Sequence, residues 1–415
     1  MSAHAEAMLA RSDGESAGGD VIQDALEAIR KHLGMEVAYF SEFVDGRSVF
    51  RRVDAPGLDH LIKVGDSHSL DDVYCNHILE GRLPELITDT SLFPLAYGMP
   101  ITSAVPIGSH VSIPIRLLDG TPYGMFCCLS PRPNPTLNER DLATMKVFAG
   151  LAAKQVNADL QERRTRHEVR DKILSVIAGV EFDIVFQPIF ELVTLTIGGC
   201  EALCRFKPQP YRSPDKWFSD ASGVGLGIDL ELAVLEAAIA AFPDLPSDVS
   251  MSVNASPEAV ISGRLSDVLA SEYAGRTILE ITEHARVSDY VALETQLAPL
   301  RQRGVRIAVD DAGAGYSGLQ HIVQLAPDII KMDMSLTRAV DTDPARRALA
   351  SAMIFYARET GSCVVAEGIE TEAELDTLKI LGANRGQGYF LGKPGPLWSV
   401  FPSSAQEAQP QRMRS

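Results

Sequence analysis

The chain has 415 residues, with 38 Lys and Arg against 55 Asp and Glu, and a formal net charge of −17. Hydrophobic residues make up 46% and charged residues 22%, which is typical of globular domains and excludes disorder along most of the chain. The length suits a barrel of about 220–250 residues plus one smaller domain. The acidic surplus argues against broad binding to nucleic acid polymers or to an anionic membrane surface. The acidic surplus is still compatible with a local cluster of positive charge, or with a metal site whose ligands are the acidic residues.

The cysteines and the N-terminal residues indicate the cellular compartment in which we expect the protein. The six cysteines include no CxxC pair and mostly stand in apolar runs, so we expect buried thiols in a reducing compartment. Residues 1–20 lack the basic segment and apolar core of a signal peptide, and no apolar run reaches about 18 residues. These features predict a cytoplasmic protein without a membrane segment.

The first predicted elements are a tail and a helix. Residues 1–19 are small, polar and rich in glycine and serine, which is typical of a loose tail. Apolar residues then recur at three- and four-residue spacing from Val21 to Leu33. This spacing predicts a helix that starts after Asp20 and ends at Gly34, which suits a C-cap.

Two Asp-Gly pairs predict β-hairpins, because Asp-Gly suits the tight turn between two strands. Asp45-Gly46 joins VAYFSEF to SVFRRV, and Asp119-Gly120 joins HVSIPIRLL to YGMFCCLS. The stretch 55–109 is irregular, and apolar spacing predicts a closing helix over about 138–155. Together these elements predict a compact α+β domain over 20–155.

A connecting segment follows at 156–178. It is highly charged and contains no Pro or Gly, which predicts a continuous helix, but its apolar stripe is patchy. Two interpretations stay open: a solvated connector, or a helix that pairs with its twin in a homodimer and transmits a signal.

From Phe182 onward, short apolar runs alternate with amphipathic stretches, which predicts an α/β barrel related to the (β/α)8, or TIM, class over 179–401. The eight strand candidates are IVFQPIF, IGGCEALCRF, SMSVNAS, TILEIT, RIAVDD, DIIKMD, CVVAEG and ANRGQGYF. In such barrels the carboxyl ends of the strands form one face, where active sites lie. A polar tail follows at 402–415.

Polar or acidic residues stand within or at the ends of several of these runs: Glu201, Asn254, Glu280, Asp310, Asp311 and Glu367. An unpaired charge beside an apolar strand is costly, and the sequence offers few nearby bases, namely Arg205 and Lys331. Carboxylates with one amide oxygen, and no nearby His or Cys, suit Mg²⁺ or Mn²⁺. Two such ions about 3.5–4 Å apart are a common device for phosphoester cleavage.

The adjacent acids Asp310 and Asp311 would point to opposite sides of a regular strand. At a strand end that turns into a loop, both can reach metals, including different ones. The segment that follows, AGAGYSG, holds three glycines and predicts a mobile or sharply turned loop over the site.

The motif Glu201-Ala202-Leu203 with Arg205 resembles the signature of the EAL-domain family, whose members are phosphodiesterases that linearise the bacterial second messenger cyclic di-GMP. The resemblance covers about 180–400. Further matches follow in order: Gln187-Pro188-Ile189, Asn254 in VNAS, Glu280-Ile281-Thr282-Glu283, Asp310-Asp311 with the glycine loop, Lys331 in IKMD, Glu367-Gly368-Ile369-Glu370 and Gln387-Gly388-Tyr389. It implies a modified barrel in which one strand runs antiparallel.

The resemblance also implies roles and cofactors, with two Mg²⁺ or Mn²⁺ ions in the site. The implied ligands of one metal are Glu201, Asn254, Glu280 and Asp310, and Asp311 serves the second. Glu367 is a further metal-site or general-base residue. Lys331 contacts the nucleophilic water or the phosphate, and Glu283 anchors the glycine loop. The implied substrate-binding residues are Gln187, Leu203, Arg205 and Gln387.

Two positions depart from the family pattern. Ala312 stands where many members have Phe, and Gly318 stands where they often have Ser. Both lie in the loop and leave every matched catalytic position filled, so we expect an active hydrolase that yields linear pGpG. The alternatives are a non-catalytic cyclic di-GMP receptor that acts through protein contacts and, less favoured by the full signature, a phosphodiesterase for other nucleotides.

Three charged residues also have plain structural interpretations. Asp333 fits an ion-paired structural acid, and Glu370 fits an acid that complements the dipole at a helix start. A lone lysine such as Lys331 is usually exposed, but its place at a strand end among acids favours a catalytic role.

In its order of elements, 20–155 resembles a GAF domain, a family that binds small ligands or mediates dimer contacts. The ligand of this domain stays unknown. Cys75 and His77 stand close together in the sequence, which is compatible with a chromophore or metal site. The favoured interpretation is that Cys75 is a buried thiol and His77 a polar histidine without a ligand. His60 and His68 show no ligand spacing.

Overall fold

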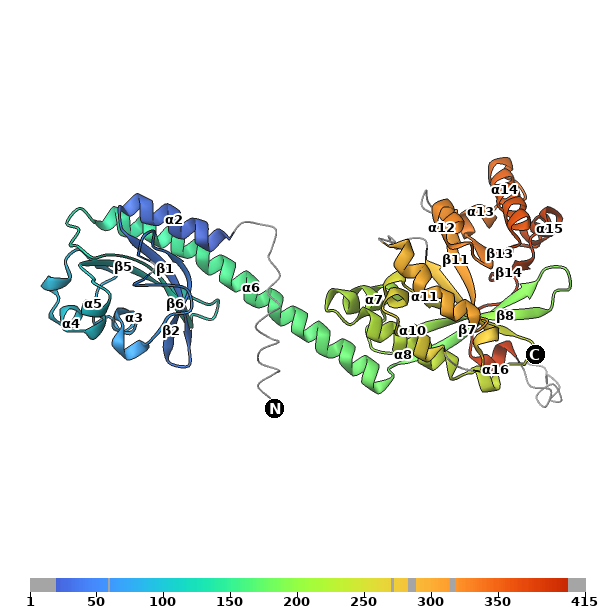
Figure 1. The fold of residues 1–415 in the computed structure, drawn as a ribbon, viewed down its shortest axis with the longest axis horizontal. Coiled ribbons are helices and arrows are strands. Elements are labelled where there is room, and N and C mark those ends of the chain that lie inside the picture. Colours follow the sequence, from blue (N-terminus) through green and yellow to red (C-terminus); the bar gives the residue numbers. More distant parts are fainter. Residues whose placement is uncertain (1–19, 59, 270–271, 283–288, 314–317, 402–415) are drawn as a thin grey trace, which may run out of the picture. The chain divides into compact units, whose positions relative to one another are not determined.

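The computed structural model describes residues 20–401, apart from 59, 270–271, 283–288 and 314–317 (Figure 1). Both predicted tails therefore lie outside the described residues. The chain divides into two compact units, Met1–Thr165 and Arg166–Ser415. Among the described residues, no helix is long and apolar enough to cross a membrane.

The first unit is built on a six-stranded antiparallel sheet with strand order β3-β2-β1-β6-β5-β4. Both predicted hairpins are confirmed, because β1 pairs with β2 and β5 pairs with β6. The strands are β1 Val37–Val44, β2 Arg47–Asp54, β3 Ser67–Ser69, β4 Leu86–Ile87, β5 Ser109–Arg116 and β6 Pro122–Ser130.

The predicted first helix is α2, Val21–Leu33. The side chain of Asp20 accepts a hydrogen bond from the amide of Gln23 at its start. Gly34 ends it in the left-handed region with φ of 61°, where a residue without a Cβ is not strained.

Each face of the sheet packs against its own helices (Figure 1). Along β6, Phe126 and Cys128 join the core against α2 and α6, whereas Met125, Cys127 and Leu129 join the core on the other side. This alternation follows from the two-residue period of a strand. The short helices of the second face are η1 Leu70–Asp72, α3 Tyr74–Leu79, η2 Thr90–Leu92, α4 Pro94–Tyr97 and α5 Pro100–Ala104.

The predicted closing helix and the predicted connecting helix form one helix, α6, Glu139–Gly179. Its first turns bury Met145 and Ala149 in the core of the first unit. Its last turns bury Ile173 and Val176 in a core cluster of the second unit. Between these ends the helix contains no Pro and a single Gly, Gly150, which a helix tolerates, so local propensity does not interrupt it.

The second unit is an eight-stranded closed barrel with strand order β10-β11-β12-β13-β14-β7-β8-β9. β7 runs antiparallel to both of its neighbours, β8 and β14, as the family resemblance implied. The strands are β7 Phe182–Glu191, β8 Ile197–Phe206, β9 Ser250–Ala255, β10 Thr277–Thr282, β11 Arg306–Ala312, β12 Ile329–Met332, β13 Cys363–Ala366 and β14 Arg385–Gly386.

Helices cover the outside of the barrel and join most of its strands (Figure 1). They bury one continuous apolar core against the outward-facing strand residues. The helices are α7 Pro214–Gly223, α8 Gly227–Ile239, η3 Phe242–Asp244, α9 Pro257–Ile261, α10 Leu265–Val268, η4 Ala274–Arg276, α11 Tyr290–Gln302, α12 Gly318–Leu325, α13 Met334–Thr337, α14 Pro344–Thr360, α15 Glu372–Leu381 and α16 Leu397–Val400.

Candidate active site

The interior of the barrel changes from an apolar layer to a charged layer along the strands. The apolar layer is a buried cluster of Ile189, Ile278, Ala308, Ile329 and Val365. Residues two apart on a strand point to the same side. Two positions further along the four parallel strands of this cluster stand Glu280, Asp310, Lys331 and Glu367. In the reversed strand β7 the corresponding residue is Gln187, two positions before Ile189.

Lys331 lies in the middle of this charged layer, with 1% of its surface exposed. Its Nζ lies 2.8 Å from Oε2 of Glu280 and 2.8 Å from Oε1 of Glu367. The same Nζ lies 2.9 Å from Oδ1 of Asp310 and 3.5 Å from Oε2 of Glu201. One ammonium group is thus shared by four carboxylates that come from different strands.

Burial and like charge shift the pKa values in this cluster. Burial raises the pKa of Glu280 well above its ordinary value, and Lys331 opposes that shift only in part. Burial also raises the pKa of Glu367 to about 8. Burial alone would lower the pKa of Lys331, but the carboxylates, Asp310 foremost, hold it well above its ordinary value. One lysine is therefore too little positive charge to keep all these acids ionised near neutral pH.

Glu201 links the charged layer to β9 and to the end of β14. Its Oε1 accepts a hydrogen bond from Nδ2 of Asn254 at 3.2 Å. Its Oε2 accepts one from Nε2 of Gln387 at 2.8 Å. Both amides therefore hold the Glu201 carboxylate in one orientation, and Asn254 would offer its Oδ1 to a metal.

Asp310, Asp311 and Glu367 each present one oxygen, and these three atoms lie within 4.8 Å of one another. Adjacent acids can share a side here because Asp311 has a left-handed φ of 55°, and because the β11–β12 pairing shifts register between Val309 and Ala312. Clustered hard oxygen donors with excess negative charge are the donor set that Mg²⁺ and Mn²⁺ prefer. The residues present therefore fit a divalent metal centre.

The predicted substrate-binding residues divide between the barrel interior and a neighbouring cavity. Gln187 is buried and donates from Nε2 to the carbonyl of Gly392 at 3.2 Å. Leu203 and Arg205 line a cavity of about 250 Å³ that Asn254 also borders. The guanidinium of Arg205 donates from Nη1 to the carbonyl of Cys204 at 2.8 Å.

Sequence reasoning missed one charged residue in this cavity, Glu231. It lies on α8, and its Oε2 accepts a hydrogen bond from the amide of Ser256 at 2.9 Å. Burial raises its pKa. In the sequence, a glutamate within an amphipathic helix looks like an ordinary surface residue, so only the packing of α8 against the barrel reveals its position.

Other predicted residues lie apart from the charged layer. Asp333 caps α13 by accepting from the amide of Ser335, and Glu370 forms an exposed ion pair with Arg338. Both roles are structural, but they differ from the ones predicted: Asp333 is a helix cap where an ion pair was expected, and Glu370 forms an ion pair where a helix-dipole role was expected. The prediction for Glu283 and most of the predicted glycine loop lie outside the described residues.

Comparison with known families matches both units. Residues 168–394 match the EAL domain family, which covers more than half of the chain. Residues 19–155 match the GAF domain family. The two matches follow the order that the sequence motifs predict.

Two curated relatives and one solved structure are similar to part of this chain. An uncharacterised protein of Sinorhizobium fredii is 32% identical over 251 residues, which make up 58% of this chain and 30% of the relative. A cyclic di-GMP phosphodiesterase of Pseudomonas aeruginosa is 32% identical over 262 residues, or 59% of this chain and 44% of the relative. This chain thus spans less than half the length of these relatives.

The solved structure is the PaMucR phosphodiesterase in complex with cyclic di-GMP. It is 28% identical, aligns with 56% of this chain and 100% of its own, and gives a TM-score of 0.51. The family match, the barrel with a reversed strand and the ordered motifs agree. The chain belongs to the EAL-domain family, and a GAF domain precedes its EAL domain.

Proposed function

We propose that this protein hydrolyses cyclic di-GMP to linear pGpG with two Mg²⁺ or Mn²⁺ ions, under the control of its GAF domain. The observation that carries the proposal is the buried acidic layer around Lys331, in which four carboxylates share one lysine. A similar phosphodiesterase from Pseudomonas aeruginosa and a solved complex with cyclic di-GMP support the choice of substrate.

The ligands of the ions would be Glu201, Asn254, Glu280, Asp310 and Asp311, with Glu367 beside them. When bound, such ions supply polarisation of the phosphate and a lower pKa for water. Glu367 would act as a general base and accept a proton at its carboxylate. Lys331 would keep its neighbouring carboxylates in place and add positive charge toward the phosphate.

The cavity beside this layer would hold part of the substrate. Its walls are mostly apolar, as suits the faces of a nucleobase, and Arg205 and Glu231 add charge at its border. Arg205 would pair with phosphate, because a guanidinium offers several fixed donors. An acidic protein can in this way admit an anionic dinucleotide, since the sign of the charge is reversed locally.

The test follows the conversion of cyclic di-GMP to pGpG by chromatography, with the purified protein in Mg²⁺ or Mn²⁺. We expect turnover that EDTA abolishes and that added metal restores. Glu367→Gln should reduce turnover at least a hundredfold, whereas Glu370→Gln, three residues further on in an exposed ion pair, should leave it unchanged. Tight binding without turnover in both metals would instead identify a cyclic di-GMP receptor and refute the hydrolase.

The proposed control by the GAF domain rests on α6, which contributes residues to a core cluster in each unit. We assign the sensor to 20–155, the connecting helix to 156–178 and the barrel to 179–401. An α-helix turns by about 100° per residue. Inserting two residues after Arg164, which is exposed, should therefore rotate one end against the other and change turnover.

An insertion of seven residues at the same point adds almost two full helical turns, so the two ends of α6 return to within about 20° of their original rotation about the helix axis. It should return turnover close to that of the parent chain. If both insertions leave turnover unchanged, α6 is only a tether and the proposed control along it is wrong, while the hydrolase proposal stands.

A further inference from the structure

Helix α7 contacts both the end of α6 and the barrel cavity, the space of about 250 Å³ that Arg205 borders. Pro214 and Phe218 are four residues apart, so they share one face of α7, and both line the barrel cavity. Trp217 and Ala221 are also four residues apart, and both belong to the buried cluster that holds the last turns of α6. One short helix thus joins the packing of α6 to a wall of the barrel cavity.

Trp217 connects α7 to α6 and to β8, and it has 1% of its surface exposed. Its ring stacks on that of Phe206, with centroids 5.1 Å apart and 22° between the ring planes. The Nζ of Lys172, on α6, lies 4.7 Å from the centroid of the same indole, where the ring attracts a cation. Nearby, Nη1 of Arg170 donates a hydrogen bond to the carbonyl of Val224, which ends α7, at 3.1 Å. The end of α6 therefore contacts α7 through directed contacts as well as apolar packing.

The aromatic cluster around Trp217 continues to the wall of the barrel cavity. The ring of Phe206 packs edge-on against that of Phe218, with centroids 5.7 Å apart. Arg205 precedes Phe206 on β8, just as Trp217 precedes Phe218 on α7. Because protein interiors are closely packed, a buried ring does not move without its neighbours. A displacement of Trp217 therefore also displaces the side chains that line the cavity.

Packing alone maintains the position of the Trp217 ring. Its Nε1 is buried and has no hydrogen-bond partner among the described residues. A buried N–H group without a partner disfavours the arrangement that contains it. The contacts from Phe206 and from α6 must outweigh that cost, so the position of this ring depends on how α6 packs.

We propose that Trp217 is a positioning residue, through which the last turns of α6 set the shape of the barrel cavity at Pro214 and Phe218. The inference rests on the function proposed above, in which this cavity holds part of cyclic di-GMP. It identifies α7 as the element of the barrel that receives the signal of the GAF domain. Coupling between two sites is reciprocal, so cyclic di-GMP in the cavity also changes the surroundings of Trp217.

The first test compares Trp217→Leu with Phe242→Leu in the full-length chain. Phe242 is also 1% exposed, and its ring stacks on that of Tyr273 at 4.8 Å, but neither residue lines the barrel cavity. Both substitutions remove a buried ring, so both should lower the melting temperature. Only Trp217→Leu should raise KM for cyclic di-GMP, by about tenfold, with kcat within about twofold, because the acids around Lys331 are unchanged. Trp217→Phe keeps an aromatic ring and should keep KM close to that of the parent chain.

Lys172→Met keeps the test valid where Trp217→Leu folds poorly, because Lys172 is exposed and its loss removes nothing from the core. This variant should raise KM about threefold without a change in kcat. Lys154→Met makes the same substitution in the part of α6 that belongs to the first unit, and it should change neither value. Parent KM values in both Trp217→Leu and Lys172→Met would overturn the proposal. An equal rise of KM in Phe242→Leu would overturn it as well.

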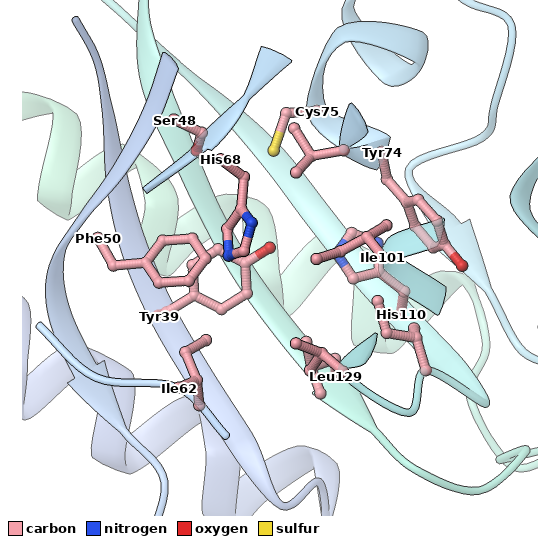
Figure 2. A pocket seen from close by; sticks show the side chains of 13 residues that line it. Tyr39, Ser48, Phe50, Ile62, His68, Tyr74, Cys75, Ile101, His110 and Leu129 are labelled. Carbon is pink, nitrogen blue, oxygen red and sulfur yellow. The ribbon is translucent and has the colours of Figure 1, made fainter. Parts of the chain in front are cut away.

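Fluorescence tests the reciprocal effect, because the chain contains two tryptophans. Trp398→Phe removes the second one, which is 67% exposed, and Glu367→Gln should suppress turnover. Adding cyclic di-GMP with Mg²⁺ to this double variant should shift the emission of Trp217. Binding in the GAF domain does not explain such a shift. The cavity there, which Tyr39 and His110 border, measures about 30 Å³ and holds only about two water-sized groups (Figure 2).

Equilibrium dialysis with cyclic di-GMP separates this inference from the proposed function. If cyclic di-GMP binds and the emission of Trp217 does not shift, the positioning role is wrong while the hydrolase proposal stands. If the parent chain binds cyclic di-GMP without turnover, the hydrolase proposal is wrong. In that case a dissociation constant that rises in Trp217→Leu but not in Phe242→Leu still supports the positioning role, and equal constants in the two variants refute it.

Discussion

Gln387 donates a hydrogen bond from Nε2 to Oε2 of Glu201 at 2.8 Å, although the two residues stand 186 positions apart in the chain. Barrel closure brings them together, because the strand order places β14 and β8 on either side of β7. Gln387 is 4% exposed, so water does not readily replace the bond. This contact fixes the carboxylate that the EAL motif contributes.

We expect Gln387→Ala to weaken metal binding and turnover by about 10- to 100-fold, because residues that orient a metal ligand have effects of that size. Measuring turnover at increasing Mn²⁺ concentrations tests this expectation. The Mn²⁺ concentration that gives half-maximal turnover should rise in the variant. The exposed residue Gln302 provides the control, since Gln302→Ala should change neither value. An unchanged Mn²⁺ dependence in Gln387→Ala would show that the contact does not position Glu201.

Lys331→Met removes the cation that four carboxylates share. Leaving buried acids without their partner should lower the free energy of unfolding by about 3–5 kcal/mol in metal-free buffer. Mn²⁺ should recover part of that loss, because it supplies the missing positive charge. Thermal unfolding with and without Mn²⁺ measures both effects.

Lys207→Met is the matched control for this experiment. Lys207 also pairs with a carboxylate, that of Asp183 at 2.8 Å, but both side chains are exposed. We expect a change within about 0.5 kcal/mol. If Mn²⁺ stabilises Lys331→Met no more than the parent chain, the acids around Lys331 do not bind the metal.

Asp311 has a left-handed backbone conformation. Substitutions at this position can therefore distinguish an effect on the free energy of unfolding from an effect on turnover. Asn tolerates this conformation nearly as well as Asp, whereas Ala is disfavoured by about 1 kcal/mol or more. Asp311→Asn should therefore keep the free energy of unfolding, and Asp311→Ala should lower it. Both should lose most turnover, because both remove a proposed metal ligand. Full activity in either variant would contradict that role.

Ile173 tests the packing of α6 on the second unit. It is 1% exposed and belongs to the cluster of Phe206 and Trp217. Ile173→Ala should cost about 2–5 kcal/mol, measured by urea unfolding with tryptophan fluorescence. The adjacent Leu174 is 42% exposed, so Leu174→Ala should cost under about 1 kcal/mol. Equal effects of the two substitutions would show that this face of α6 is not packed as described.

Local patterns predicted most elements of the fold. Apolar spacing located α2, Asp-Gly pairs located both hairpins, and alternating apolar runs located the eight barrel strands, all of which the structure confirms. These signals are readable because each depends on residues within a few positions of one another. The single helix α6 was predicted in two parts, since the sequence changes from amphipathic to charged within it.

The sequence by itself determined which side chains could form the site, because acids at the ends of apolar strands imply a shared face. Only the tertiary structure decided how they meet. The enclosure of Lys331 by four carboxylates and the turn that brings Asp311 to the side of Asp310 depend on strand order and register. Those are long-range pairings, which no local pattern within one segment indicates.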